Sequence, residues 1–172
     1  MKRHIVLVGL PGCGKTTVGR LVAERLHAEF VDIDAILSRR EGKPITMIFA
    51  EKGEAAFRDM ERQQMETALG NAAAVIAPGG GWAAQPGAIE GAKGRALVVY
   101  LRARPETAAL RAASEGTRPL LMGEDPLVRM RELQKEREAF YRTAHAEVDA
   151  DRKSAPQVVS EVIRLAQSSA GW

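Results

Sequence analysis

The chain has 172 residues, which is enough for one domain with a sizeable core and would leave a second domain cramped. Hydrophobic residues make up 45% and charged residues 27% of the chain, a composition that excludes a disordered protein. The net charge is +3, but the 25 basic and 22 acidic side chains are interleaved and form no basic tract, so we expect no nucleic-acid partner.

Apolar, β-branched runs alternate with helical patterns along the chain. Strands are predicted at 5–8, 29–33, 73–77, 96–101 and 146–148. Helices are predicted at 15–27, 33–41, 44–51, 54–69, 105–113, 126–143 and 155–168. This alternation indicates a single α/β domain over residues 1–172 with a mainly parallel sheet. The stretch at 114–124 lacks periodicity and is predicted to be a mobile loop, and residues 168–172 are expected to fray.

The start of the chain and its cysteine content indicate the cellular compartment in which the protein works. The apolar run before Gly9 is too short for a signal peptide or a membrane span. The single cysteine, Cys13, excludes an internal disulfide and a cysteine-built zinc site, which agrees with a reducing compartment. We therefore expect a cytoplasmic protein without a membrane partner.

The segment Gly9–Thr16 reads GLPGCGKT and fits the phosphate-binding motif G-x-x-x-x-G-K-[ST] without a mismatch. It stands between a predicted strand and a predicted helix, where glycines can turn the backbone N–H groups toward phosphates at the positive end of the helix. We expect this P-loop to bind a nucleotide, with Lys15 on the β- and γ-phosphates and the Thr16 hydroxyl on Mg²⁺. The alternative is a glycine-rich turn that binds nothing.

Cys13 lies inside this loop and allows two interpretations. A thiol among inward N–H groups at a helix N-terminus can have a lowered pKa and react readily. The alternative is a small residue that fills a tolerant position. The histidines, His4, His27 and His145, show no ligand spacing and are expected to be structural or surface residues.

Asp32 and Asp34 stand at the carboxyl end of the second predicted strand, on the face opposite to Val31 and Ile33. Ligands of open α/β sheets bind at that end of the strands. Asp32 can hold water on Mg²⁺, and Asp34 can accept a hydrogen bond or a proton from an attacking hydroxyl. The alternative is a pair of solvated turn aspartates in which Asp34 caps the next helix.

Arg137 falls on the apolar stripe that Met130, Leu133 and Phe140 form along one predicted helix. A buried guanidinium is costly unless it is paired, and its fork fits a carboxylate of the protein or of a substrate. The alternative, equally open from the pattern, is that Arg137 snorkels to the surface or pairs with a local glutamate.

Gly79, Gly80 and Gly81 follow the third predicted strand. Three glycines in a row remove side chains and expose N–H groups where a ligand approaches the backbone. Arg58 and Glu61 lie one turn apart on the preceding helix, a spacing that more commonly gives a surface ion pair than a binding site.

The chain closely resembles the shikimate kinases from Ile5 to about Val162. The matching residues are the P-loop with Val18-Gly19-Arg20, Asp32-x-Asp34, Ile48-Phe49, Gly53-Glu54, Phe57-Arg58-x-x-Glu61, Val75-Ile76-Ala77, Gly79-Gly80-Gly81, Val99-Tyr100-Leu101, Arg118-Pro119-Leu120-Leu121, Asp125-Pro126, Arg137 and Tyr141. The resemblance implies the nucleoside-monophosphate-kinase fold, a three-layer domain with a five-stranded parallel sheet, helices on both faces and a mobile lid at about 112–124. It implies transfer of the γ-phosphoryl group of ATP to the 3-hydroxyl of shikimate, with Mg²⁺.

The resemblance also implies roles for particular residues. Shikimate would be bound by Asp34, Arg58, Gly79, Gly80, Gly81 and Arg137, with the two arginines on its carboxylate. The nucleotide would be bound by Gly12, Cys13, Gly14, Lys15, Thr16, Thr17, Arg111, Arg118 and Lys153. Arg118 would close over the phosphates from the lid, and Arg111 and Lys153 would lie near adenine. The expected catalytic residues are Lys15, Asp34 and Arg118, and the expected metal ligands are Thr16 and Asp32.

Some positions depart from the family pattern, among them Pro78, Trp82 and the segment Gln85-Pro86-Gly87. Trp82, where a smaller residue is usual, could narrow the rim of the substrate site. A related P-loop sugar-acid kinase, such as a gluconate kinase, and a nucleotide-binding module without catalysis are the competing hypotheses. ATP and shikimate are the expected partners of a monomeric protein.

Overall fold

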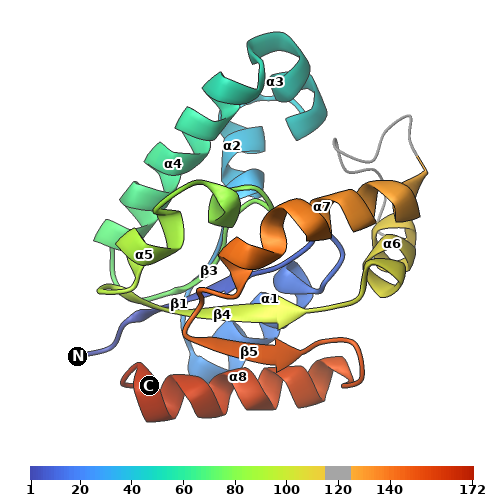
Figure 1. Cartoon of the computed structure of the whole chain (residues 1–172). Coiled ribbons are helices and arrows are strands. Elements are labelled where there is room, and N and C mark those ends of the chain that lie inside the picture. Colours follow the sequence, from blue (N-terminus) through green and yellow to red (C-terminus); the bar gives the residue numbers. More distant parts are fainter. Residues whose placement is uncertain (115–124) are drawn as a thin grey trace.

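Five short strands form one parallel sheet in the order β2-β3-β1-β4-β5, which confirms the expected architecture (Figure 1). We analysed a computed structural model that describes residues 1–114 and 125–172. The strands are β1 (His4–Val8), β2 (Phe30–Asp32), β3 (Val75–Ala77), β4 (Ala96–Arg102) and β5 (Ala146–Asp149). In the centre of the sheet Ile5 pairs with Val75 on one side and with Leu97 on the other.

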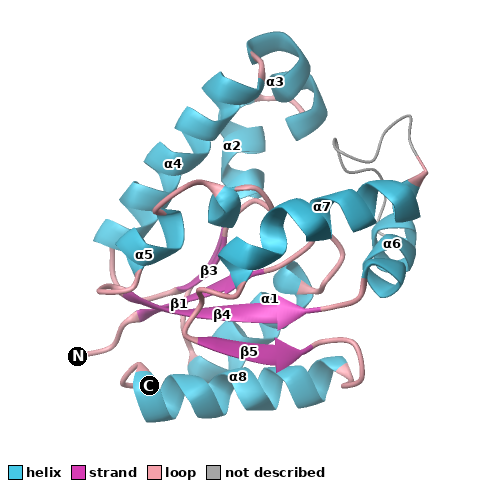
Figure 2. Cartoon of the chain, in the orientation of Figure 1, coloured by secondary structure: helices cyan, strands magenta, loops and turns pink. Residues whose placement is uncertain are grey.

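Helices cover both faces of the sheet (Figure 2). They are α1 (Lys15–Leu26), α2 (Ile33–Glu41), α3 (Ile45–Lys52), α4 (Glu54–Gly70), α5 (Ala88–Ala92), α6 (Pro105–Ser114), α7 (Pro126–Tyr141) and α8 (Ala155–Ser169), with a 3₁₀ turn η1 (Trp82–Ala84). All seven predicted helices are present. The sequence pattern missed α5 and η1, because each is too short to show a helical period.

Alternate residues of β1 enter two different apolar cores, as the period of a strand requires. Ile5 and Leu7 pack with α1 and α8, whereas Val6 and Val8 pack with α4, α5 and α7. The buried residues of both cores are at most 8% exposed, so the sheet is closely packed on both faces. Among the described residues no helix is long and apolar enough to cross a membrane.

The expected fraying of residues 168–172 is wrong. The Trp172 indole Nε1 donates a hydrogen bond to the Arg3 carbonyl (2.9 Å), and the Lys2 ammonium lies 4.6 Å from the centroid of the Trp172 ring. Ala170 is buried and accepts a hydrogen bond from the Arg3 amide (2.9 Å). Trp172 therefore anchors the C-terminal residues against the first residues of the chain through both its indole N–H and its ring.

The expected lid lies almost wholly outside the described part of the chain. Residues 115–124, including Arg118, are not described. Residues 112–114 belong to α6 and not to a loop, which corrects the expected start of the lid at 112 and the predicted helix end at 113.

Candidate active site

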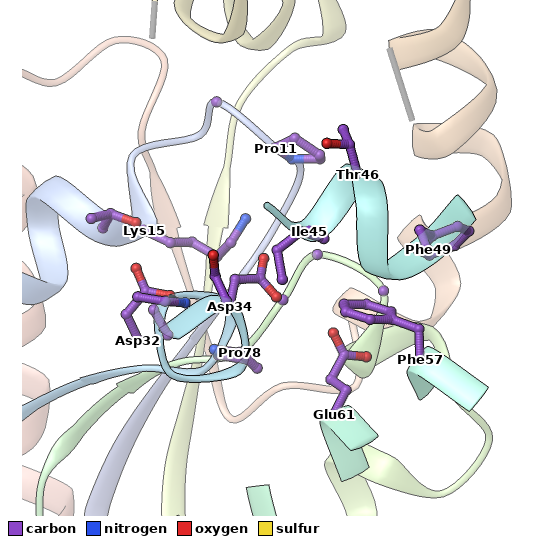
Figure 3. A pocket seen from close by; sticks show the side chains of 18 of the residues that line it. Pro11, Lys15, Asp32, Asp34, Ile45, Thr46, Phe49, Phe57, Glu61 and Pro78 are labelled. Atoms are coloured by element: carbon purple, nitrogen blue, oxygen red, sulfur yellow. Dashed lines mark hydrogen bonds between the residues drawn. The ribbon is translucent and has the colours of Figure 1, made fainter. Parts of the chain in front are cut away.

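A cavity of about 640 Å³ opens at the carboxyl ends of β1, β2 and β3 (Figure 3). The P-loop and the first turn of α1 form one wall, the start of α2 forms the floor, and α3, α4 and the glycines after β3 form the opposite wall. The carboxyl ends of neighbouring parallel strands meet at one edge, which explains why these segments converge. The cavity has the size and the mixed polar and apolar lining of a site for small molecules.

Glycine is needed in the P-loop for its conformation. Gly12 and Gly14 have φ angles of +80° and +102°, values that residues with a Cβ rarely adopt. A methyl group at Gly12 would also overlap the Ala108 carbonyl of α6. Gly14 is the N-cap of α1, and no side chain caps this helix end. The loop therefore offers backbone N–H donors and the positive end of α1 to the cavity.

Lys15 lies along the inner side of the loop. Its Nζ donates hydrogen bonds to the carbonyls of Gly9 (2.7 Å) and Leu10 (2.9 Å), which hold the ammonium at the cavity wall. Cys13 does not line the cavity; its side chain is 1% exposed and packs into the core behind the loop, with Sγ 3.7 Å from Lys15 Nζ. Because a reactive thiol needs access to its reagent, this burial favours the interpretation of Cys13 as a packing residue.

Asp32 and Asp34 sit on either side of the start of α2. Asp32 ends β2 in an extended conformation and caps α2, with Oδ1 accepting a hydrogen bond from the Ala35 amide (3.1 Å). The alternative in which Asp34 caps this helix is therefore wrong. Figure 3 shows the Asp34 carboxylate inside the cavity, with Lys15 on one side and Phe57 and Glu61 on the other.

Thr16 and Asp32 line the same cavity and bring a hydroxyl and a carboxylate to it. Both are oxygen donors, which Mg²⁺ prefers, and that ion commonly keeps several waters and takes only one or two protein ligands. In the described ranges no cluster of three or more His, Cys, Asp or Glu side chains could hold a metal. The donor set fits a magnesium ion that is shared with phosphates.

Arg58 and Glu61 form a buried ion pair in the cavity wall, so the surface-pair alternative is wrong. Arg58 Nη1 lies 3.1 Å from Glu61 Oε1, and the side chains are 11% and 1% exposed. The guanidinium carbon of Arg58 lies 5.8 Å from the ring centroid of Phe49 and 5.5 Å from that of Phe57. At these distances both rings attract the guanidinium through cation–π interactions.

Gly79 and Gly81, in the loop after β3, lie close to the ends of charged side chains. A methyl group at Gly79 would overlap Glu61 Oε2 and lie 2.7 Å from Asp34 Oδ1, and one at Gly81 would overlap the Arg58 guanidinium. The expected reason, room for a ligand at the backbone, is therefore incomplete. The absence of side chains at this loop also lets the acidic and basic groups of α2 and α4 approach each other.

Arg137 is buried, with 5% of its surface exposed, and lines the cavity from α7. Its Nη1 has no hydrogen-bond partner within the described residues. The snorkelling alternative is wrong, because the side chain does not reach the surface. Behind it the Tyr141 hydroxyl donates a hydrogen bond to the Gly80 carbonyl (3.2 Å), and burial raises the pKa of Tyr141 to about 12. A buried cation with an unused donor has the charge and the hydrogen-bonding capacity that an anion would satisfy.

Arg111 and Lys153 lie apart from the cavity, beyond the P-loop. The Arg111 guanidinium donates to the carbonyls of Cys13 (3.5 Å) and Ala150 (3.1 Å), so it joins the P-loop to the segment after β5. Lys153, in that segment, pairs with Glu161 of α8. Of the two, Arg111 contacts the P-loop directly, and neither residue lines the cavity.

Glu61 is the most unusual titratable group in the cavity. Burial raises its pKa to about 7, while the charge of Arg58 opposes this rise and the charge of Asp34 adds to it. The glutamate was expected on the surface, since its spacing from Arg58 is that of a solvated pair. In the fold Glu61 is 1% exposed, because α4 packs against the glycine loop and brings Oε2 close to Gly79.

The raised pKa of Glu61 predicts a pH-dependent stability. Because the folded-state pKa lies above the unfolded value, this carboxyl stabilises the fold below about pH 4.5 and the contribution is lost as pH rises through about 7. The free energy of unfolding of Glu61→Gln, taken relative to that of the wild type, should therefore increase by up to about 3 kcal/mol when the pH is raised from 4.5 to 8. Urea denaturation of both proteins at several pH values measures this, and a pH-independent difference would refute it.

Other residues of the site could not be predicted from spacing. Phe49 and Phe57 meet Arg58 from two helices, and their positions depend on the angle between α3 and α4. Trp82 does not narrow the rim: it is 4% exposed and packs in the core with α4, α5 and α7. The size and apolar character of the Trp82 ring could have indicated a core residue, since burial of a large apolar ring is strongly favourable.

A P-loop at the end of β1, facing a wall of buried arginines and carboxylates across one cavity, defines an α/β kinase for a small acceptor. The chain belongs to the shikimate kinase family, whose family model matches residues 11–167.

Relatives of this family are similar to the chain over nearly its whole length. A shikimate kinase of Symbiobacterium thermophilum is 42% identical over 167 residues, which cover 95% of this chain and 96% of that protein. The structure of the Acinetobacter baumannii shikimate kinase in complex with shikimate has a TM-score of 0.91 and 37% identity and covers 98% of this chain and 94% of that one. A gluconokinase of Sinorhizobium meliloti, with a TM-score of 0.63 and 20% identity over 99% of this chain and 94% of that one, shares the fold alone.

Proposed function

We propose that the protein transfers the γ-phosphoryl group of ATP to the 3-hydroxyl of shikimate and releases shikimate 3-phosphate and ADP. The observation that carries this proposal is the buried Arg137, which has an unused donor and lies with Arg58 in the wall that faces the P-loop. Two cations at one end of a small cavity fit a carboxylate, and Asp34 between them and Lys15 fits the hydroxyl that accepts phosphate.

On the nucleotide side, the P-loop N–H groups and Lys15 bind the phosphates and offset the charge that develops on the transferred group. Thr16 and Asp32 would hold Mg²⁺, which when bound neutralises charge on the phosphates. Gly12, Gly14 and Thr17 line the phosphate end of the cavity. The family resemblance supports a place for adenine near Arg111 and Lys153, with Cys13 contributing its backbone, and a role for Arg118 over the phosphates.

On the acceptor side, Arg58 and Arg137 bind the carboxylate of shikimate and thereby set the distance from that group to the reacting hydroxyl. Asp34 orients this hydroxyl and accepts its proton, while Gly79, Gly80 and Gly81 let the ring approach the backbone. Most of the rate enhancement comes from such positioning and from charge stabilisation, because the phosphoryl group needs little covalent help. The protein acts as a cytoplasmic monomer on these two small molecules.

The test is a coupled ADP-release assay with shikimate, quinate and gluconate side by side at equal concentrations. We expect release with shikimate at least a hundredfold faster than with gluconate, because both carry a carboxylate for the arginines but only the ring of shikimate fixes the distance from that group to the reacting hydroxyl. Faster release with gluconate would favour the sugar-acid kinase. Binding of ATP and shikimate without ADP release would favour the silent nucleotide-binding module.

A further inference from the structure

The Tyr141 hydroxyl takes no part in the phosphoryl transfer described above, yet it contacts the wall of the acceptor site. Tyr141 is the last residue of α7, is fully buried, and donates a hydrogen bond to the Gly80 carbonyl (3.2 Å). This bond joins the end of α7 to the glycine loop, although the two segments are 61 residues apart in the chain. Because loss of the donor would leave a carbonyl without its partner, the bond fixes the two segments relative to each other.

Gly80 is the point where three parts of the site meet. Arg137 stands one helical turn before Tyr141, so both side chains lie on the same face of α7. Burial raises the pKa of Tyr141 to about 12, and the charge and proximity of Arg137 oppose this rise, as expected for a guanidinium beside the hydroxyl. A methyl group at Gly80 would lie 3.1 Å from Arg137 Nη1 and 3.6 Å from Pro11 Cγ. The P-loop, the glycine loop and the buried arginine of α7 therefore converge at Gly80.

We propose that Tyr141 is a positioning residue: by joining the Gly80 carbonyl to α7 beside Arg137, its hydroxyl sets where the acceptor's carboxylate binds relative to the P-loop. Tyr141 does not line the cavity, so it acts through Arg137 and Gly80, which do. This inference rests on the proposed function, because it takes the anion at Arg137 to be the carboxylate of the acceptor.

One end of the Arg137 guanidinium needs such a restraint. Its Nη1 has no hydrogen-bond partner within the described residues, so no protein group there ties it down. An arginine has a long and flexible stem, and ordering it when a ligand binds costs affinity. The ring of Tyr141, in contrast, is held by the core, where its centroid lies 5.1 Å from that of Tyr100 at an interplanar angle of 32°. A fixed ring that ends in a hydroxyl therefore gives the arginine and the glycine loop a common reference point.

Tyr141→Phe removes the hydroxyl and keeps the ring. Steady-state kinetics with shikimate and with its carboxamide, which is similar in shape but carries no charge, tests the role of the hydroxyl. We expect kcat/KM for shikimate to fall about tenfold, chiefly through a higher KM, because the carboxylate is bound in both the ground state and the transition state. For the carboxamide kcat/KM should fall less than about threefold, and the KM for ATP should change less than about twofold. A merely structural role would lower kcat/KM for both acceptors alike.

Tyr100→Phe is the matched control, since it also removes one hydroxyl from a buried ring of the same core. Tyr100 is 1% exposed, and its hydroxyl lies near Gln134 of α7. Within the described residues that hydroxyl has no hydrogen-bond partner, so its loss leaves the glycine loop unchanged. This variant should keep kcat/KM for both acceptors within about twofold of the wild type.

A second measurement uses the wild-type protein. The chain has two tyrosines, so labelling tyrosine with ¹³C at Cζ gives one NMR signal for Tyr141 and one for Tyr100, which Tyr100→Phe assigns. Shikimate should shift the Tyr141 signal more than the Tyr100 signal, because its carboxylate neutralises the charge beside the Tyr141 hydroxyl. The carboxamide should shift the Tyr141 signal less than shikimate does.

Three results would overturn the inference. Tyr141→Phe could lose equally with both acceptors, or lose no more than Tyr100→Phe does, or shikimate could leave the Tyr141 signal of the wild type in place. The last result does not depend on Tyr141→Phe, so it decides the matter even if that variant fails to fold. A wild type that neither binds nor phosphorylates shikimate would instead contradict the proposed function itself.

Discussion

A Lys15→Met variant should lose about a thousandfold in kcat, which corresponds to about 4 kcal/mol of transition-state stabilisation. The ammonium is held at the cavity wall by the carbonyls of Gly9 and Leu10, so it is already in place when the phosphates enter. Methionine keeps the length and the apolar stem of the side chain but carries no charge. Stopped-flow or coupled measurement of ADP release at saturating ATP and shikimate gives the loss directly.

Lys135→Met serves as the control for Lys15→Met. Lys135 is an exposed lysine on α7, and its replacement also removes one positive charge from the protein. This variant should keep kcat within about twofold, because exposed charges contribute little. If Lys15→Met retained more than a tenth of the wild-type kcat, Lys15 would not act on the transferred group.

An Asp34→Asn variant should lower kcat by about a hundredfold to ten-thousandfold, the range found for a positioned general base. The carboxylate lies in the cavity between Lys15 and Glu61, and a methyl group at Gly79 would lie 2.7 Å from its Oδ1. Asparagine fills the same space but accepts a proton poorly. Shikimate should still bind, because both arginines remain, so the loss should appear in kcat far more than in the Kd.

Single-turnover kinetics with enzyme in excess separates these effects for Asp34→Asn. The exposed Asp59, which pairs with Arg62 on the outer side of α4, offers the matched Asp59→Asn control with an unchanged rate. A single-turnover rate for Asp34→Asn within about threefold of the wild type would show that Asp34 neither orients the hydroxyl nor accepts its proton.

The sequence predicts the nucleotide half of this site more fully than the acceptor half. Glycines, lysine and threonine of the P-loop are adjacent in the chain, and one strand and one helix hold them, so their spacing alone indicates phosphate binding. The order of buried strands and amphipathic helices likewise predicts the parallel sheet, because each strand must be covered on both faces.

The acceptor half depends on contacts between segments far apart in the chain. The apolar stripe on α7 leaves it open whether Arg137 faces the core or the surface, and only its burial in the fold resolves the choice. The spacing of Arg58 and Glu61 is the same in a solvated pair and in a buried one. In the fold Gly79 lies against the Glu61 carboxyl, and no local pattern reveals this contact.

Two details at element ends also differ from what the local patterns suggested: one alternative made Asp34 a helix cap, and the final residues were expected to fray. A cap requires extended backbone at the residue before the helix, and Asp32 has φ −103° and ψ 109°, whereas Asp34 is already helical. The final residues looked frayed because they are small and polar, yet Trp172 finds the Arg3 carbonyl and the Lys2 ammonium. Both outcomes follow from contacts that become available only when the fold is complete.

The most direct measurement of the central claim is the structure of the product formed from ATP and shikimate. Phosphorus–proton correlation NMR of the reaction mixture identifies which hydroxyl carries the ester, and quantification of ADP gives the stoichiometry. The membership in the shikimate kinase family predicts one ester at the 3-hydroxyl for each ADP released, and the place of Asp34 in the cavity between Lys15 and the arginines agrees with one acceptor hydroxyl. Inorganic phosphate with unmodified shikimate, or an ester at another hydroxyl, would contradict the account.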